Sequence, residues 1–338
     1  INALYTNIST GEIVDITGKG VDDIKNHIIR TPNDPDTIYD DDPLRILRCI
    51  RFASRYGWDI EPETYEGMVR NVSRLEIITK ERVQDEFCKM LTCKHPVMAM
   101  ELLRKTGAMH YVIPELEETY SMTQNEYHFG TVWEHTMMVL EGTKDDNMIL
   151  RISALLHDIG KIRVCTEEDG KIHFLKHELK SGEMIDELLR PLKFSNEIIK
   201  EVTFLVRNHM ICKTWGSECE YMKDKKLRRL QYECKTEERF RNLMTIIDAD
   251  NNAYAADKCM PKQVEFILSR TEAMKAEGSA MFGYKLPLTG KEIMDLKGIK
   301  PGSAVKECLD YLMKIAFVNP LRKKEEFVKH LLGYRLQK

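Results

Sequence analysis

The sequence lacks the features of a membrane protein or a disulfide-rich protein. Its 338 residues contain no apolar run of about 18 residues, the length that a membrane-spanning helix requires. Its nine cysteines are odd in number and form no CxxC pair, which argues for reduced thiols and against a cysteine-based zinc site. The net charge of −3 gives no general attraction to nucleic acid. We therefore expect a cytoplasmic protein without a membrane partner, and any RNA surface should be a local patch.

The most informative stretch is Leu155-Leu156-His157-Asp158-Ile159-Gly160-Lys161, where an imidazole and a carboxylate stand side by side after an apolar run. Adjacent helical residues point about 100° apart, so His157 and Asp158 can share an ion only if it lies close against the helix. Further ligands must then come from other segments. Candidates of the same chemistry are His135, His177, His209 and Asp250.

Asp250 lies in a strongly apolar helical segment and is predicted to point inward. The residues three, four and seven positions before it are Ile247, Ile246 and Leu243, which place it on an apolar face. Asp248 faces a more mixed side and is the weaker candidate. Imidazole and carboxylate together suit Mn, Fe, Co, Ni or Zn better than Ca. Six such ligands are more than one tetrahedral ion needs, which favours two bridged ions.

The order His, His-Asp, His, His, Asp resembles that of HD-domain phosphohydrolases. The surrounding sequence, over about residues 121–260, is similar to the HD domain of some bacterial tRNA nucleotidyltransferases. The matching stretches are Tyr127-His128, TVWEHT over residues 131–136, and LLHDIGK. The resemblance implies a divalent metal and the hydrolysis of phosphoesters such as 2′,3′-cyclic phosphates. Its six metal ligands would be His135, His157, Asp158, His177, His209 and Asp250.

Two neighbours of the His-Asp pair extend this prediction. Residues 163–176 indicate a hairpin with Asp169-Gly170 at its turn, which would place His177 at the mouth of the metal site. Lys161, which ends the LLHDIGK stretch, is a candidate contact for a substrate phosphate.

A second informative stretch runs from Asp40 to Ala53. Three carboxylates and Pro43 precede an apolar helical pattern, which predicts a helix with acidic residues at its N-terminus. Several arginines share one face with Asp42. They are Arg45, Arg48 and Arg51. Chemistry alone leaves open whether this face binds a ligand or only carries arginines that extend along apolar neighbours to solvent.

The same stretch resembles the neck of class II CCA-adding enzymes, tRNA nucleotidyltransferases of the poly(A) polymerase family. In that family an acid-acid-x-x-Arg element acts as a template for the incoming nucleotide. Carried over, Asp42 and Arg45 would hydrogen-bond to the Watson–Crick edge of C or A. Asp41 stands where the family usually has Glu, and Arg48 and Arg51 would line the same nucleotide site. The resemblance implies ATP and CTP as substrates and tRNA as the partner.

A further neck element of this family matches at Glu81, Arg82 and Glu86. Its charge pattern is equally what an exposed helix with ion pairs would show. We assign these residues a structural role, in which they orient the template helix.

Residues 1–30 have the clearest strand character. Two short strands flank Ser9-Thr10-Gly11, and a helix is predicted over Asp22–Arg30. Two strands cannot hold a sheet alone, so we interpret them as the last strands of a catalytic head that begins upstream of Ile1. The family's Gly-Gly turn and the paired Asp residues that hold Mg²⁺ would lie there, and residues 1–30 contain no Asp-x-Asp pair. We expect no nucleotidyl transfer by this chain unaided.

The C-terminal part is helical and charged. Residues 297–302 resemble the tail of the same nucleotidyltransferases, and Gly298 and Gly302 could present backbone N–H groups to a phosphate. A turn between helices with a C-cap glycine explains these residues almost as well.

The predicted fold is mainly α. It comprises a short β remnant of the nucleotidyltransferase head, a helical neck with the nucleobase template, an all-α HD domain and a helical tail with a tRNA contact. The predicted bounds are 1–30, 31–120, 121–260 and 261–338.

The predicted function is that of a portion of a tRNA nucleotidyltransferase, which adds CCA or part of it to tRNA 3′ ends, joined to an HD phosphohydrolase. Two alternatives remain open. One is a stand-alone HD metal phosphohydrolase acting on a nucleotide, against which the Asp42/Arg45 element speaks. The other is an RNA-binding scaffold with a vestigial metal site, against which the complete ligand set speaks.

Overall fold

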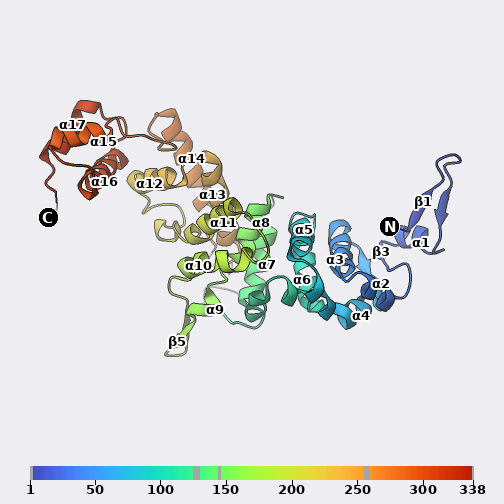
Figure 1. The fold of residues 1–338 in the computed structure, drawn as a ribbon. Helices are drawn as coiled ribbons and strands as arrows, with labels where there is room; N and C mark the ends of the chain where they lie inside the picture. Colours follow the sequence, from blue (N-terminus) through green and yellow to red (C-terminus); the bar gives the residue numbers. More distant parts are fainter. Residues whose placement is uncertain (1–2, 125–129, 144–145, 255–258, 337–338) are drawn as a thin grey trace. The chain divides into compact units, whose positions relative to one another are not determined.

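The structure of the protein, a computed structural model, is predominantly helical. It describes residues 3–124, 130–143, 146–254 and 259–336. Helices make up 63% of the described residues, and the strands of the described residues form three separate two-stranded sheets (Figure 1). The prediction of a mainly α fold is confirmed. The Tyr127-His128 pair lies outside the described residues.

The chain divides into two compact units. The first comprises Ile1–Met210 and Ala249–Cys259, and the second comprises Ile211–Asp248 and Met260–Lys338. Among the described residues, no helix combines the length and the apolar character needed to cross a bilayer.

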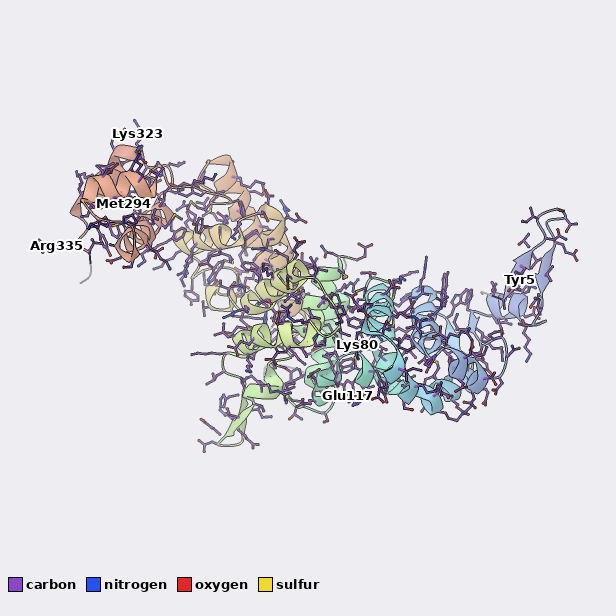
Figure 2. All side chains as sticks on the ribbon, viewed as in Figure 1. Tyr5, Lys80, Glu117, Met294, Lys323 and Arg335 are labelled. Atoms are coloured by element: carbon purple, nitrogen blue, oxygen red, sulfur yellow. The ribbon has the colours of Figure 1, made fainter. Side chains whose placement is uncertain are left out.

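The first unit begins with a hairpin of two antiparallel strands, β1 (Leu4–Thr6) and β2 (Ile13–Asp15). The expected hairpin is confirmed, and its strand residue Tyr5 projects into solvent (Figure 2). The helix predicted over Asp22–Arg30 is wrong in its bounds, because α1 covers only Gly20–Lys25. Ile28–Ile29 instead form β3, which pairs in parallel with β4 (Asp59–Ile60). Long-range strand pairing thus overrides the local helical pattern.

Short helices follow, and they share a core of buried residues that includes Tyr39, Ile46, Leu47 and Phe87. Their bounds are α2 (Pro35–Asp41), α3 (Leu44–Tyr56), α4 (Pro62–Asn71), η1 (Val72–Ile77), α5 (Lys80–Leu91), α6 (Pro96–Thr106), η2 (Ala108–Tyr111) and η3 (Pro114–Thr119).

The helix predicted after the acidic run is present as α3, but the acidic run itself is not its first turn. Asp41 is the last residue of α2, Asp42 is an extended C-cap residue, and Pro43 is the N-cap of α3. The Asp42 side chain accepts a hydrogen bond from the Leu44 backbone N–H, at 3.3 Å. The carboxylates therefore lie at a junction between two helices, where their side chains are not on one helical face.

The candidate metal ligands belong to the next helices of the first unit and to the end of α13. These elements are α7 (Val132–Gly142), α8 (Met148–Leu156), α9 (Lys161–Val164), β5 (Thr166–Glu168), β6 (Lys171–His173), α10 (His177–Leu189), α11 (Asn196–Asn208) and α13 (Glu237–Asn252). The hairpin predicted over residues 163–176 is confirmed, since β5 and β6 pair antiparallel and both Asp169 and Gly170 have positive φ.

The second unit contains η4 (Lys213–Trp215), α12 (Asp224–Cys234), most of α13, α14 (Gln263–Ala276), α15 (Gly290–Lys297), α16 (Ser303–Val318) and α17 (Lys324–Gly333). The last three helices have their own core, in which Ile293, Leu312 and Phe327 are fully buried. The buried Arg228 guanidinium of α12 donates to the carbonyls of Phe317 and Val318 at the C-terminus of α16. This places a cation at the negative end of a helix dipole.

Candidate metal centre and nucleotide face

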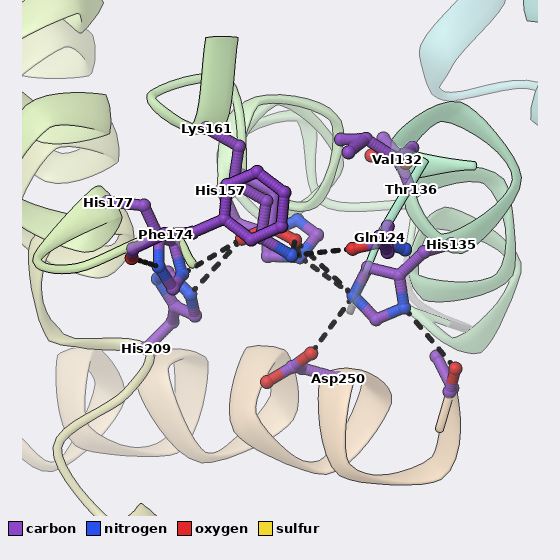
Figure 3. Close-up of polar contacts among 12 residues, drawn as sticks. Gln124, Val132, His135, Thr136, His157, Lys161, Phe174, His177, His209 and Asp250 are labelled. Atoms are coloured by element: carbon purple, nitrogen blue, oxygen red, sulfur yellow. Dashed lines mark hydrogen bonds and ion pairs between the residues drawn. The ribbon is translucent and has the colours of Figure 1, made fainter. Parts of the chain in front are cut away.

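Four imidazoles and two carboxylates from five helical segments meet at one buried point of the first unit (Figure 3). His135 lies in α7, His157 and Asp158 directly follow α8, and His177 begins α10. His209 directly follows α11, and Asp250 lies in the last turns of α13. The prediction that Asp250 points inward is confirmed, because its side chain is buried and faces His135.

Local sequence explains how two of these side chains reach the centre. Thr131 and Glu134 form a capping box that begins α7, so His135 lies in the first turn of that helix. Gly160 follows the His-Asp pair, and a Cβ atom there would lie 2.4 Å from the backbone nitrogen of Ser181. Only glycine therefore lets this turn pack against α10, the helix that carries His177.

Each of the four imidazoles is oriented by a backbone carbonyl at its Nδ1 atom. Nδ1 lies 2.8 Å from the Ala154 oxygen in His157, 2.9 Å from Phe174 in His177, 2.7 Å from Val206 in His209 and 3.3 Å from Ala253 in His135. A carbonyl can only accept, so Nδ1 carries the proton, and a neutral ring then offers the lone pair of Nε2. All four Nε2 atoms face the centre. This arrangement is typical of metal-ligating histidines.

Asp158 lies between two pairs of imidazoles. Its Oδ2 atom is 3.3 Å from Nε2 of His157 and 3.6 Å from Nε2 of His135. Its Oδ1 atom is 3.1 Å from Nε2 of His177 and 3.7 Å from Nε2 of His209. Two ligand groups, His135/His157/Asp158 and Asp158/His177/His209, therefore share this one carboxylate. Asp250 Oδ1, at 3.2 Å from His135 Nε2, adds to the first group.

Burial determines the protonation of part of this cluster. It lowers the pKa of His209 to about 3 and lowers that of His135. Burial also opposes ionisation of Asp158, yet His157, Lys161 and His177 together hold the pKa of this carboxyl well below its usual value. Burial opposes the charged form of His157 as well, but the adjacent Asp158 carboxylate raises the pKa of this imidazole. The centre thus combines an ionised carboxylate with two imidazoles, His135 and His209, that burial keeps neutral, and these are the protonation states in which such groups bind a divalent ion.

The donor set fits divalent ions. His135 Nε2 and His157 Nε2 lie 3.3 Å apart, and when both rings are neutral with Nδ1 protonated, each Nε2 offers a lone pair. Two lone pairs that face each other in a buried site are compatible with a cation between them. The mixture of imidazole and carboxylate donors suits transition metals or zinc.

Lys161 also reaches the centre, where the sequence predicted a phosphate contact. Its buried ammonium lies 2.6 Å from Asp158 Oδ2 and donates to Gln124 Oε1 at 2.7 Å. Gln124 was not predicted, because it stands between elements of the fold and no local pattern marks it. A phosphate role for Lys161 stays a prediction.

The predicted nucleotide residues lie together in the neck, and three of them, Asp41, Asp42 and Arg45, already have an ionic partner in that region. Arg45 pairs with Asp41 at 2.8 Å, and Asp42 pairs with Arg82 of α5 at 3.0 Å. The exposed fractions of these side chains are substantial, 49% for Arg82 and 29% for Asp42. Arg82 therefore contacts the Asp42 carboxylate, and its predicted role in orienting the template helix stays a prediction.

For Glu86, the alternative of an exposed helix with ion pairs does not describe the structure. Glu86 is buried, and its carboxylate accepts a hydrogen bond from Arg51 at 2.5 Å. Arg51 is itself nearly covered, with 11% of its side chain exposed. This pair joins α3 to α5, whereas Glu81 lies on the surface of α5.

A groove of about 870 Å³ opens beside the template residues. Its wall includes Asp42, Arg45 and Arg48 together with residues of α1, α2 and the segment before α2. A cavity of this size accommodates a nucleotide. Arg48 therefore lines the groove, while Arg51 is engaged by Glu86.

The two tail glycines lie at helix ends. Gly298 is the C-cap of α15 with φ 63°, and Gly302 is the N-cap of α16. The alternative of a turn between helices is thus present in the structure, and the phosphate contact stays a prediction.

Two family models match the chain. One, described as the probable RNA and SrmB-binding site of polymerase A, matches residues 57–119, and the HD domain model matches residues 125–251. The HD match covers all six residues of the centre and implies a divalent metal there. The fold and the centre thus define an HD-domain protein.

Relatives and a solved structure extend the similarity over nearly the whole chain. The chain is 28% identical over 310 residues to an A-adding tRNA nucleotidyltransferase of Deinococcus radiodurans, covering 88% of this chain and 68% of the relative. It is 25% identical over 332 residues to a CC-adding tRNA nucleotidyltransferase of Thermus thermophilus, covering 94% and 72%. A crystal structure of the Bacillus stearothermophilus CCA-adding enzyme in complex with CTP has the same fold, with TM-score 0.61, 22% identity and coverage of 98% and 71%. Over most of its length the chain is thus similar in sequence to tRNA nucleotidyltransferases, and it has the fold of a CCA-adding enzyme.

Proposed function

We propose that this chain serves the addition of CCA, or of part of it, to tRNA 3′ ends, with ATP and CTP as substrates. It would contribute the neck, the HD domain and the tail of the enzyme. The observation that carries the proposal is the groove in the neck, whose wall holds Asp42, Arg45 and Arg48 at the positions of the family's template. Mg²⁺ for the transfer step would be held by the paired carboxylates of a catalytic head, which residues 3–30 do not supply.

The ion pairs of the neck suggest how the template acts. Both pairs are partly exposed, so they contribute little stability and can exchange partners at little cost. When a base enters, Asp42 would accept a hydrogen bond from its amino group, and Arg45 would donate to its ring nitrogen or carbonyl. A base with the opposite pattern of donors and acceptors would leave the charge of Asp42 or Arg45 desolvated and without a partner. This cost would be the origin of the selectivity among bases.

The tail is the part of the chain whose charge suits tRNA. Residues 281–338 carry twelve Lys and Arg against six Asp and Glu, although the whole chain has a net charge of −3. Lys323 and Arg335 are exposed on this part (Figure 2). A local basic surface provides contacts to phosphates that do not depend on sequence.

The HD domain supports a second proposed activity, the metal-dependent hydrolysis of phosphoesters such as 2′,3′-cyclic phosphates. The observation in its favour is the pair of ligand groups that share Asp158. His135, His157 and Asp250 would hold one ion and His177 and His209 the other, with Mn, Fe, Co, Ni or Zn as the metal. When bound, such ions supply Lewis-acid chemistry and activate water towards a phosphoester. Lys161 would donate from its ammonium to a substrate phosphate oxygen.

One experiment tests both activities. The chain is supplied with Mn²⁺, Co²⁺ or Ni²⁺ and 2′,3′-cyclic nucleotides or a nitrophenyl phosphodiester, and in parallel with Mg²⁺, labelled CTP or ATP and tRNA that lacks its 3′ end. We expect hydrolysis that a chelator abolishes, and no incorporation by this chain alone. Incorporation of label would contradict the assignment of transfer to a separate head, and absence of hydrolysis with a fully loaded centre would remove the second activity.

A further inference from the structure

Four aromatic side chains form a row on the surface of the neck, next to the groove. We call Phe52, Tyr56, Trp58 and His27 the aromatic ladder. The ring centroids of Phe52 and Tyr56 lie 6.4 Å apart and nearly parallel, those of Tyr56 and Trp58 lie 5.1 Å apart, and those of Trp58 and His27 lie 5.2 Å apart and stacked. The row is thus continuous from the last turns of α3 to the residues that precede β3 and β4.

The aromatic ladder begins in the groove and ends in solvent. Phe52 is one of the residues that line the groove, beside Arg45 and Arg48. Tyr56 has 42% of its surface exposed, and His27 is exposed as well. Aromatic rings that serve only to stabilise a fold are expected to be buried. Burial in the core stabilises the folded state more than stacking on the surface does.

Cationic side chains accompany the rings. The guanidinium carbon of Arg48 lies 5.9 Å from the Phe52 ring centre, and that of Arg55 lies 5.6 Å from the Tyr56 ring centre. Rings that are accessible to solvent, interleaved with arginines, are the composition of surfaces that bind single-stranded nucleic acid. The rings stack on bases, and the guanidiniums attract the phosphates.

We propose that the aromatic ladder binds the unpaired nucleotides at the 3′ end of an RNA by stacking their bases, and so leads that end to the groove where the next nucleotide is selected. This proposal deepens the proposed function and takes the identity of the RNA from it. The stacking contact itself depends only on Tyr56, Trp58 and His27, which are not part of the template.

Trp58 provides a direct signal for this contact. The other two tryptophans, Trp133 and Trp215, are buried with 2% and 3% of their surface exposed. An oligoribonucleotide of about six cytidines, a length within the usual range for such surfaces, should quench the fluorescence of Trp58 when its bases stack. A backbone of the same length without bases should not, at the same salt concentration. Trp58→Phe keeps a ring and should keep the affinity while it removes the signal.

Variants of Tyr56 give the decisive measurement. Tyr56→Ala should weaken oligonucleotide binding about tenfold. Tyr221→Ala, which removes an exposed tyrosine elsewhere in the chain, is the matched control and should bind as the unmodified protein does. Tyr56→Leu keeps the apolar bulk and should fold even if Tyr56→Ala does not, yet it should lose the same affinity.

Two outcomes overturn the proposal. One is equal binding of the oligonucleotide and of the backbone without bases. The other is an affinity of folded Tyr56→Ala or Tyr56→Leu within twofold of the unmodified protein. Selection among free nucleotides is measured separately and tests the proposed function. The aromatic ladder can therefore be supported when the template role of Asp42 and Arg45 is refuted, and the template role can be supported when the aromatic ladder is refuted.

Discussion

The candidate metal centre and the proposed template of the neck each contain a carboxylate beside nitrogen-bearing side chains, but the surroundings of the two carboxylates are opposite. Asp158 is buried, and four imidazoles whose Nδ1 atoms are held by backbone carbonyls surround it. Asp42 is partly exposed and pairs with one arginine whose side chain is 49% exposed. The side chains around Asp158 are fixed before any ligand binds. The ion pair of Asp42 can be replaced by a contact with a ligand.

This difference has an energetic basis. A buried charge that loses its partners costs several kcal/mol, since the interior cannot replace the lost contacts. A surface ion pair contributes about 0–1 kcal/mol, because water solvates both partners when they separate. Burial of Asp158 therefore suits the proposed binding of metal ions, and the partial exposure of Asp42 suits the proposed exchange of nucleotides.

The largest effect is expected from Asp158→Ala. The shared carboxylate contributes an oxygen to both ligand groups, so its loss should lower metal affinity by about 100-fold or more and abolish hydrolysis, while the helices remain folded. Metal analysis of the purified variant, with circular dichroism, is the measurement. Asp248→Ala, which alters the half-buried carboxylate nearest to Asp250, is the matched control. Unchanged metal content in Asp158→Ala would remove this residue from the ligand set.

The next largest effect concerns the buried ion pair inside the neck. Glu86→Gln leaves the Arg51 guanidinium without a charged partner in a site where 11% of its side chain is exposed, so the free energy of unfolding should fall by about 3–5 kcal/mol. Urea denaturation measures it. Glu81→Gln changes an exposed carboxylate of the same helix and should leave stability nearly unchanged. Similar stability of the two variants would mean that the neck does not depend on this pair.

A smaller effect is expected when Arg45 is replaced. Arg45→Ala should reduce the preference for CTP and ATP over UTP and GTP by about 1–3 kcal/mol, because only a matching base satisfies the guanidinium. Equilibrium binding of the four nucleotides is compared with that of Lys89→Ala, an exposed cation of α5. If affinity for all four falls equally, Arg45 contacts the phosphates or serves the fold and does not select the base.

The smallest effect on stability is expected from Arg82→Ala. Its pair with Asp42 is partly exposed, so the free energy of unfolding should change by less than about 1 kcal/mol. Selectivity among nucleotides should nevertheless decrease, since Asp42 is then no longer oriented. A loss of stability as large as that of Glu86→Gln would show that the neck pair is as structural as the buried one.

Chemistry that is carried by adjacent residues could be predicted from the sequence. The His157-Asp158 pair, the inward face of Asp250 and the hairpin before His177 follow from helical or strand periodicity and from turn residues. Asp42 and Arg45 were identified from a motif. The sequence did not predict that Glu86 is buried or that Gln124 meets Lys161, because each contact joins residues far apart in the chain.

The sequence by itself determined the mainly α fold, the identity of the six candidate ligands and the position of the candidate template element, because residue type and local spacing specify them. Only the tertiary structure decided which residues share a partner. It ended α2 at Asp41, paired Ile28–Ile29 with Asp59–Ile60, and placed Asp158 between two pairs of imidazoles. The physical reason is that periodicity defines the face of a single element, whereas partners across elements depend on the packing of the whole core.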